Sequence, residues 1–302
     1  MTRKEKVAKH FQKKHLLTVS NSFYKEQLLA LFDWMKICDG VADDLTTKYL
    51  GLSGQCVAEV ISKQAGVISG IEEIAFLLDS KTTLVVDKHV SGDVLLRLSG
   101  NVKEILGLER IILNIIGRMS GIATYTNLFL QKIKEIPNPP LLVSTRKTPW
   151  MLLDKKAVCD GGGGTHRLSL SDFALVKNTH LFTSDSSIEK VVQKMMASGD
   201  FFEIEVGSIQ QAEAVIDILE KAQYQEAAIM LDNVSPKIAL EFMDKFKNHP
   251  FYEHVYIEAS GEVTKDNLLL WADTGVDVIS SGSLTHSAPA FNVSMLTKTP
   301  AF

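Results

Sequence analysis

The sequence predicts an α/β protein, with a mixed α+β layer up to about residue 120 and repeated strand–helix units from about residue 140. In the second part, short apolar runs recur with helical stretches between them, which is the pattern of parallel βαβ units. None of these runs alternates apolar with polar residues cleanly, as expected of parallel strands that are covered on both faces.

The first 120 residues mix two kinds of periodicity. Residues 22–37 and 101–117 have the apolar spacing of helices, and Asn101 is suited to cap the second. Strands are expected at residues 55–62, 82–87 and 92–98. The basic N-terminal stretch, residues 1–17, has no apolar core after its charges, so we expect a solvated helical arm rather than a secretory signal.

From residue 140 strands and helices alternate regularly. The runs expected as strands are residues 141–144, 173–176, 202–206, 228–231, 255–259 and 277–280. The helices expected between them are residues 187–199, 208–222 and 235–246, each beginning at a serine, and further helices are expected from near Thr264 and Leu284. Units of this kind can form a closed barrel or an open sheet.

Polar groups or glycines follow nearly every expected strand, which favours the barrel. These groups are Thr145, Arg146, Lys147, Lys177, Glu205, Asp232, Asn233, Ser260, Gly261, Ser281 and Gly282. Active sites of α/β barrels are assembled at the carboxyl ends of the strands. The reactive groups at these strand ends therefore predict one site to which all of them contribute.

A cluster of positive charge indicates what this site binds. The cationic or protonatable side chains of the cluster are Arg146, Lys147, His166, Arg167 and Lys177, in a chain whose formal net charge is −4. Guanidinium groups bind carboxylates and phosphates through paired hydrogen bonds, and ammonium groups add compact charge. The cluster predicts a pocket for a small ligand with several negative charges.

Consecutive glycines precede two members of this cluster. Glycine disfavours a helix interior by about 1 kcal/mol, so Gly161–Gly164 form either a flexible loop or a place where backbone approaches a ligand closely. Their position shortly before His166 and Arg167 favours close approach. His166 either contacts the ligand or orients its neighbour, and His180 and His286 suit structural hydrogen bonds and ligand contacts equally.

Carboxylates and serine–glycine turns complete the expected site. Glu205 and Asp232 either balance the positive charges or bind sugar hydroxyls or a Mg²⁺ ion that the substrate brings, since Mg²⁺ prefers carboxylate and phosphate oxygens. Ser260-Gly261 and Ser281-Gly282-Ser283 precede expected helices, and backbone amides at such turns bind anions. These turns are expected to hold a phosphate, with plain turns as the alternative.

Composition excludes several classes of protein. A net charge of −4 over 302 residues argues against a dedicated nucleic-acid binder, which is usually basic. Cys38, Cys56 and Cys159 have neither zinc nor disulfide spacing, which indicates a reducing compartment. No run approaches the roughly 18 apolar residues of a membrane span, so we expect a cytoplasmic protein without a membrane partner.

The motifs of this chain resemble those of the quinolinate phosphoribosyltransferases, the nicotinate-nucleotide pyrophosphorylases (carboxylating) of NAD biosynthesis. The matching segments are 39–47 (DGVADDLTT), 66–70 (GVISG), 108–114 (LERIILN), 118–124 (RMSGIAT), 144–148 (STRKT), 156–172 (KAVCDGGGGTHRLSLSD), 175–180 (LVKNTH), 203–206 (EIEV), 231–233 (LDN), 258–262 (EASGE) and 281–287 (SGSLTHS). They cover nearly the whole chain, and their order and spacing make the resemblance specific.

This resemblance implies a fold and an assembly. The fold is that of a type II phosphoribosyltransferase: an N-terminal α/β sandwich domain, residues 1–124 joined by the tail 291–302, and a TIM-like seven-stranded α/β barrel, residues 125–290. The assembly is a homodimer, or a higher oligomer, with active sites at the subunit interface. The implied substrates are quinolinate and phosphoribosyl pyrophosphate, the latter with Mg²⁺, and no nucleic acid is expected to bind.

The family pattern also assigns roles to residues. Quinolinate would meet Thr145, Arg146, Lys147, His166, Arg167 and Lys177, with Arg110 reaching in from the neighbouring subunit. Phosphoribosyl pyrophosphate would meet Glu205, Asp232, Ser260, Gly261, Glu262, Ser281, Gly282, Ser283 and His286. Catalysis would rest on Lys147, Glu205 and Asp232, and the Mg²⁺ ion would lie near the two carboxylates.

The implied activity transfers phosphoribose to quinolinate with decarboxylation, which gives nicotinate mononucleotide, pyrophosphate and CO₂. Two alternatives stay open: a barrel aldolase with Lys177 as its Schiff base, which needs a desolvated lysine, and a non-catalytic or altered-acceptor paralogue that binds an aromatic carboxylate. The chain departs from the common family pattern at Asn178-Thr179, Gly207 and Glu262. A carboxylate at Glu262 suits a phosphate loop only if its backbone N–H, rather than its side chain, faces the phosphate.

Overall fold

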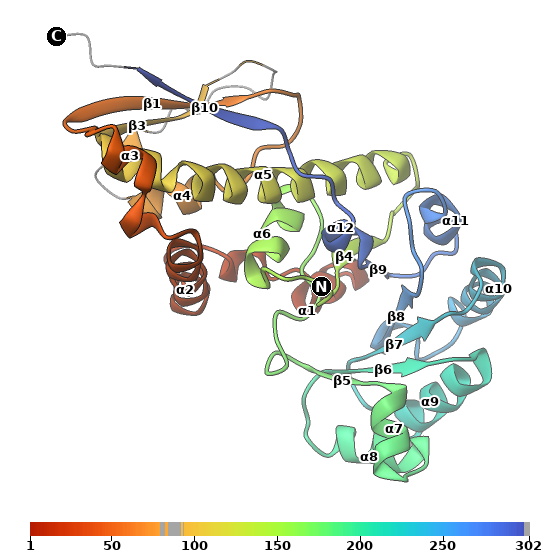
Figure 1. The fold of residues 1–302 in the computed structure, drawn as a ribbon. Coiled ribbons are helices and arrows are strands. Elements are labelled where there is room, and N and C mark those ends of the chain that lie inside the picture. The colour runs from red at the N-terminus through yellow and green to blue at the C-terminus, as the bar shows by residue number, and fades with distance from the viewer. Residues whose placement is uncertain (79–81, 84–91, 93, 299–302) are drawn as a thin grey trace. The chain divides into compact units, whose positions relative to one another are not determined.

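A computed structural model describes residues 1–78, 82–83, 92 and 94–298 (Figure 1). By packing, the chain forms two compact units. The first unit comprises Met1–Lys13, Leu128–Thr148 and Gly163–His286, and the second comprises the described residues of Lys14–Asn127, Pro149–Gly162 and Ser287–Phe302. These units differ from the predicted domain boundaries chiefly in two stretches: residues 1–13 pack with the strand–helix unit, and residues 149–162 pack with the other.

The first unit is built on a parallel sheet. Its strands are β4 (Leu141–Ser144), β5 (Ala174–Val176), β6 (Phe202–Val206), β7 (Ala227–Asp232), β8 (Val255–Ser260) and β9 (Val278–Ser281). They pair in the order β4-β9-β8-β7-β6-β5, and all neighbours are parallel. Every predicted strand of this half is confirmed, and the parallel pairing brings their carboxyl ends to one edge.

The resemblance implied seven barrel strands, whereas the described residues form a sheet of six. The next position along the sheet is only a parallel bridge between Val143 and Gly164. Glycine has no side chain to pack and weakens a strand interior, so the glycine run makes a single bridge where a seventh strand was expected. In the described part of the chain no ladder joins this bridge to β5, and the TIM-like barrel is open there.

Helices of the first unit follow its strands. They are α7 (Asn178–Ser184), α8 (Ile188–Met196), α9 (Ile209–Lys221), α10 (Pro236–Phe246), α11 (Leu268–Ala272) and α12 (Ser283–His286). The side chains of Ser187, Ser208 and Ser235 cap α8, α9 and α10 by accepting backbone N–H groups, as predicted. In Figure 1 these three helices flank β5 to β8.

The N-terminal helix α1 (Arg3–Phe11) is not the solvated arm that its charges suggested. Val7 and Phe11 are buried in the core of the first unit, together with Tyr256 and Val278. Arg3 donates to both carboxylate oxygens of Asp277 at 2.7 and 2.6 Å. Val7 and Phe11 are four residues apart, so they lie on one face of the helix. With this face the helix packs at the amino ends of the strands.

The second unit contains an antiparallel sheet in the order β10-β1-β3-β2. Its strands are β1 (Gln55–Ser62), β2 (Thr82–Thr83), β3 (Val94–Asn101) and β10 (Val293–Lys298), so the C-terminal segment pairs with β1 as implied. The strand predicted at 82–87 is described only for residues 82–83, and residues 84–87 lie outside the described residues.

The helices of the second unit are α2 (Ser22–Asp39), α3 (Leu45–Tyr49), α4 (Ile71–Leu78), α6 (Leu152–Asp160) and α5 (Val102–Ile133) as far as residue 127. The Asn101 side chain accepts the Lys103 N–H at 2.9 Å, which confirms the predicted cap. Among the described residues, no helix combines the length and apolar character that crossing a bilayer requires.

Candidate active site

A cavity of about 1150 Å³ lies at the carboxyl ends of the parallel strands. The predicted site residues that line it are Thr145, Arg146, Lys147, His166, Arg167, Lys177, Glu205, Asp232, Ser260, Gly261, Glu262, Gly282, Ser283 and His286. All of them belong to the first unit. The volume exceeds the range of about 300–1,000 Å³ common for pockets of one small ligand, so it suits two ligands side by side.

Positive side chains on three loops meet in this cavity. Arg146 and Lys147 follow β4, Lys177 follows β5, and Arg167 lies on the loop between these strands. Burial, and then repulsion from Arg146, lower the pKa of Arg167. Within the part of the chain that the structure describes, none of the four is ion-paired with a carboxylate, so their charge is available to an anionic ligand.

Two carboxylates face the same cavity from neighbouring strands. Glu205 lies near the end of β6, and its Oε1 accepts the Asn178 N–H at 3.4 Å. Asp232 ends β7, and its Oδ2 accepts from the Asn233 side chain at 2.9 Å. Carboxylate oxygens with hydroxyl and amide oxygens nearby are the hard donors that Mg²⁺ prefers, so the residues present fit this ion.

The serine–glycine turns after β8 and β9 need glycine for different reasons. Gly261 has a φ of +99°, and a Cβ there would lie 2.6 Å from the Oδ1 atom of Asn233. A Cβ on Gly282 would lie 3.0 Å from atoms of Lys147 and His286. Both turns thus keep bare backbone at the cavity wall, which a phosphate group can approach closely.

Two predicted site residues lie outside the cavity. Ser281 is buried and its Oγ donates to the Val263 carbonyl oxygen at 2.6 Å, so its side chain supports the turn. Arg110 is exposed in the second unit, where it lines a separate cavity of about 380 Å³ with Asp39 and Glu109. That Arg110 contacts quinolinate in a neighbouring subunit stays a prediction.

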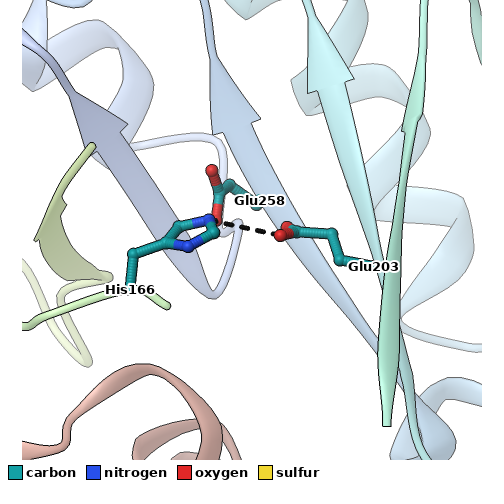
Figure 2. Close-up of side chains that lie close together, drawn as sticks. All are labelled: His166, Glu203 and Glu258. Carbon is teal, nitrogen blue, oxygen red and sulfur yellow. Dashed lines mark ion pairs between the residues drawn. The ribbon is translucent and has the colours of Figure 1, made fainter. Parts of the chain in front are cut away.

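The His166 ring lines the cavity and faces the side chains of Glu203 on β6 and Glu258 on β8, as Figure 2 shows. Its Nε2 atom lies 3.2 Å from a carboxylate oxygen of Glu203 and 3.1 Å from one of Glu258. Burial would lower the pKa of His166, but attraction from Glu258 and Glu203 outweighs it and raises the pKa. Burial and the neighbouring Glu258 raise the pKa of Glu203 to about 7.

Comparisons with known proteins agree with this architecture. Residues 44–120 match the model of the N-terminal domain of quinolinate phosphoribosyl transferase, and residues 122–296 match that of its C-terminal domain. This chain belongs to the quinolinate phosphoribosyltransferase family. It is 35% identical over 246 residues to a probable nicotinate-nucleotide pyrophosphorylase [carboxylating] of Archaeoglobus fulgidus, with 79% of this chain and 93% of the relative covered.

Two further proteins are similar to this chain over most of its length. A probable nicotinate-nucleotide pyrophosphorylase [carboxylating] of Bacillus subtilis is 32% identical over 280 residues, which cover 89% of this chain and 93% of the relative. The solved nicotinate-nucleotide pyrophosphorylase of Francisella tularensis is 28% identical with a TM-score of 0.77, over 90% of this chain and 96% of that chain. The family's α/β architecture therefore extends over nearly all of the chain.

One departure from the common quinolinate phosphoribosyltransferase pattern has a clear structural setting. Glu262 has a φ of +48°, in the left-handed region where glycine is at ease. Its side chain is exposed at the rim of the cavity. The family's second glycine at this position is thus explained by backbone conformation, and Glu262 holds the same turn at a conformational cost.

Glu203 and Glu258 were missed among the site residues of this family member. Glu203 lies two residues before Glu205 on β6, and Glu258 lies two residues before Ser260 on β8. Because strand side chains alternate between faces, residues two apart point the same way. That spacing was the signal by which both could have been placed inside the barrel.

Proposed function

We propose that this protein is a quinolinate phosphoribosyltransferase, which transfers phosphoribose from phosphoribosyl pyrophosphate to quinolinate with loss of CO₂. The observation that carries the proposal is the convergence of Arg146, Lys147, Arg167 and Lys177 opposite Glu205 and Asp232 in one cavity. Quinolinate has adjacent carboxylates on a pyridine ring, and a group of cations that no described carboxylate pairs with suits such a dianion. The carboxylates across the cavity suit the sugar.

The cations would orient the dicarboxylate before reaction. Each charge-assisted hydrogen bond to Arg146, Lys147, Arg167 or Lys177 is worth roughly 1.5–3 kcal/mol. Holding the pyridine nitrogen against the ribose lowers the entropic part of the barrier, since the two reactants no longer have to find each other in solution. Lys177 is exposed, which favours this binding role over the desolvated lysine of an aldolase.

The chemistry then proceeds in two bond exchanges. The bond between ribose C1 and the pyrophosphate oxygen breaks with its electrons on pyrophosphate, and the lone pair of the pyridine nitrogen forms the new bond to C1. Glu205 and Asp232 would stabilise the positive charge that develops on the ribose. The bond from ring C2 to its carboxylate next breaks, CO₂ leaves, and the electron pair takes up a proton, with the cationic ring acting as the electron sink.

Magnesium and the phosphate groups are assigned to the same cavity. Glu205 and Asp232 would hold Mg²⁺ together with oxygens of phosphoribosyl pyrophosphate, and the ion would neutralise charge on the leaving pyrophosphate. The turns at Ser260-Gly261 and Gly282-Ser283 would hold the 5′-phosphate through backbone N–H groups.

We assign the active form to a homodimer in the cytoplasm. Arg110 belongs to the second unit and does not line the cavity of the first unit. The dimer would place Arg110 at the quinolinate site of the neighbouring subunit. Among the described residues no disulfide joins Cys38, Cys56 or Cys159, which suits a reducing compartment.

The decisive test is incubation with quinolinate, phosphoribosyl pyrophosphate and Mg²⁺ while nicotinate mononucleotide, pyrophosphate and CO₂ are measured. Equal amounts of the three products are expected, and nicotinate in place of quinolinate should give no turnover. Binding of quinolinate without products would instead support a non-catalytic paralogue. Turnover of nicotinate at a comparable rate would support an altered acceptor and contradict the proposed substrate.

A further inference from the structure

Two carboxyl groups that the reaction does not use lie in the barrel interior, beneath the catalytic cavity. Glu203 and Glu258 are fully buried, and both contact the Nε2 atom of His166. We propose that Glu203 and Glu258 are positioning residues, which act through the His166 ring to hold Arg167 in the orientation that receives a carboxylate of the acceptor. This inference rests on the proposed function and assigns residues to its acceptor site.

The His166 ring is held on both of its nitrogen atoms. Nε2 lies between the two carboxylates, which come from β6 and β8 (Figure 2). Nδ1 accepts the backbone N–H of Arg167 at 2.7 Å. A rotation of the ring away from Glu203 and Glu258 would therefore also break the contact that fixes the Arg167 backbone.

The backbone of this loop is fixed from below by α1. The Phe11 carbonyl oxygen accepts the N–H groups of Thr165 at 2.9 Å and His166 at 3.0 Å. The Phe11 ring packs edge-on against the His166 ring, with 5.3 Å between the ring centroids. His166 adopts a φ of +50°, an uncommon conformation for a residue with a side chain. Held in this way, His166 turns the chain so that Arg167 lines the cavity.

The tautomer distinguishes this support from a metal site. His166 and the two glutamates form a cluster with the composition of a metal-binding triad. A neutral histidine that binds a metal through Nε2 must carry its proton on Nδ1, but Nδ1 here accepts a hydrogen bond from Arg167 N–H. The proton is therefore on Nε2, which lies 3.2 and 3.1 Å from carboxylate oxygens of Glu203 and Glu258, and these close contacts support the loop rather than a metal ion.

Buried carboxyl groups are poor stabilisers in themselves, which is a reason to look for another role. Taking such charges out of water costs several kcal/mol, and apolar residues of similar size often replace them without loss of stability. Glu203 also attracts the Arg167 guanidinium and so opposes the repulsion that Arg146 exerts on it. Glu203 thus acts on Arg167 both through the His166 ring and through its own charge, whereas Glu258 acts through the His166 ring.

The test compares Glu203→Gln and Glu258→Gln with Glu226→Gln. Glu226 is a matched control because it also pairs with a histidine, His10 at 2.9 Å, in the same unit and away from the cavity. We expect both cluster variants to raise the KM for quinolinate about tenfold or more, the effect of one weakened charge-assisted contact. The KM for phosphoribosyl pyrophosphate should stay within about twofold, and Glu226→Gln should leave both constants within about twofold.

Equal increases in both KM values would indicate a merely structural role and overturn the proposal, as would no change in either. If the glutamine variants do not fold, Glu258→Asp keeps the charge and shortens its reach to His166, and the same split in KM is expected.

Phthalate, a benzene dicarboxylate without a ring nitrogen, separates this inference from the proposed function. Its binding, measured by calorimetry, needs the orientation of Arg167 but no turnover. Weaker phthalate binding in both cluster variants supports the positioning role even if the wild type makes no product, and unchanged binding refutes it even if the wild type is active.

Discussion

Both ends of the parallel sheet carry charged side chains, but the two ends use them differently. At the amino ends, charges are paired: Arg3 with Asp277 at 2.6 Å, and His10 with Glu226 at 2.9 Å. At the carboxyl ends, Arg146, Lys147, Arg167 and Lys177 line a cavity, and none is paired with a carboxylate among the residues described. Positive charges without partners repel one another. Their presence together at one cavity therefore indicates an anionic ligand that neutralises them.

Arg3 and His10 of these pairs come from α1, which precedes the residues that the family models match. The matched family domains begin at residue 44, and α1 precedes them while its Phe11 lies in the core of the first unit. The difference teaches that charge density alone does not mark a site. Charge without partners, next to a cavity and at the carboxyl ends of parallel strands, does so.

The largest effect is expected where the unpaired charge is removed. Arg167→Ala and Lys147→Ala should each lower kcat/KM about 100-fold or more, because each removes charge-assisted contacts worth roughly 1.5–3 kcal/mol apiece. Lys9→Ala is the matched control, since Lys9 is an exposed cation paired with Glu226 at 3.1 Å. Steady-state kinetics with both substrates, and thermal unfolding to verify folding, provide the measurement.

Near-normal rates in both variants would remove Arg167 and Lys147 from the site. A similar loss in Lys9→Ala would mean that activity depends on the overall charge of the protein rather than on the cavity, and the comparison between the two ends would fail.

The second effect concerns the paired end. Arg3 donates to Asp277 and to the Val255 carbonyl oxygen at 2.7 Å, and both charged side chains are largely buried. Arg3→Ala should lower the free energy of unfolding by about 2–3 kcal/mol, since it leaves a buried carboxylate without its partner. Urea unfolding measures this change, and kcat/KM at a temperature where the variant is folded should stay within about twofold. A large loss of activity in the folded variant would place Arg3 among the functional residues.

The strands and the cavity lining could be predicted from sequence because parallel buried strands are short apolar runs with polar ends. β7, for example, was expected at 228–231 and spans Ala227–Asp232. The lining followed from the rule that such strand ends meet. The prediction of a solvated arm for α1 was wrong. It gave more weight to the charges of α1, which lie mostly at the surface, than to the two apolar residues Val7 and Phe11 that decide its packing.

Helix α6 and the roles of Glu203 and Glu258 escaped prediction from hydrophobicity patterns for a shared physical reason. In α6, Asp154 and Lys155 are as buried as the leucines before them, so the helix has no polar face to give a periodic pattern. Glu203 and Glu258 are likewise charged residues in the interior. Patterns of hydrophobicity identify buried apolar residues, and they miss polar groups whose partners come from distant segments.

A smaller effect is expected from pH. The cluster of His166 and the two glutamates lies between the two ends, and it holds protons to a higher pH than the unfolded chain. The pKa of Glu203 rises from 4.5 to about 7 because the carboxyl group is buried beside Glu258. The folded state therefore binds more protons, so stability falls as pH rises from about 4.5 to 7. Urea unfolding at several pH values should show this decline, and Glu203→Gln should lessen it. Stability that rises over this range would contradict the assigned environment of the cluster.

The smallest effect separates charge from backbone at the rim of the cavity. Glu262 has a φ of +48° and is exposed beside the expected phosphate turn. Glu262→Gly should raise the free energy of unfolding by up to about 1 kcal/mol, because glycine adopts this conformation without strain. It should also lower the KM for phosphoribosyl pyrophosphate about two- to threefold, since one exposed carboxylate no longer repels the phosphate, an effect that salt screens.

Glu262→Gln is the matched control, because it removes the charge and keeps the side chain. If repulsion is the cause, both variants lower this KM equally and only Glu262→Gly gains stability. If Glu262→Gln leaves the KM unchanged, the Glu262 carboxylate points away from the phosphate. Its charge then does not act on the ligand, unlike the charges that line the cavity at the carboxyl ends of the strands.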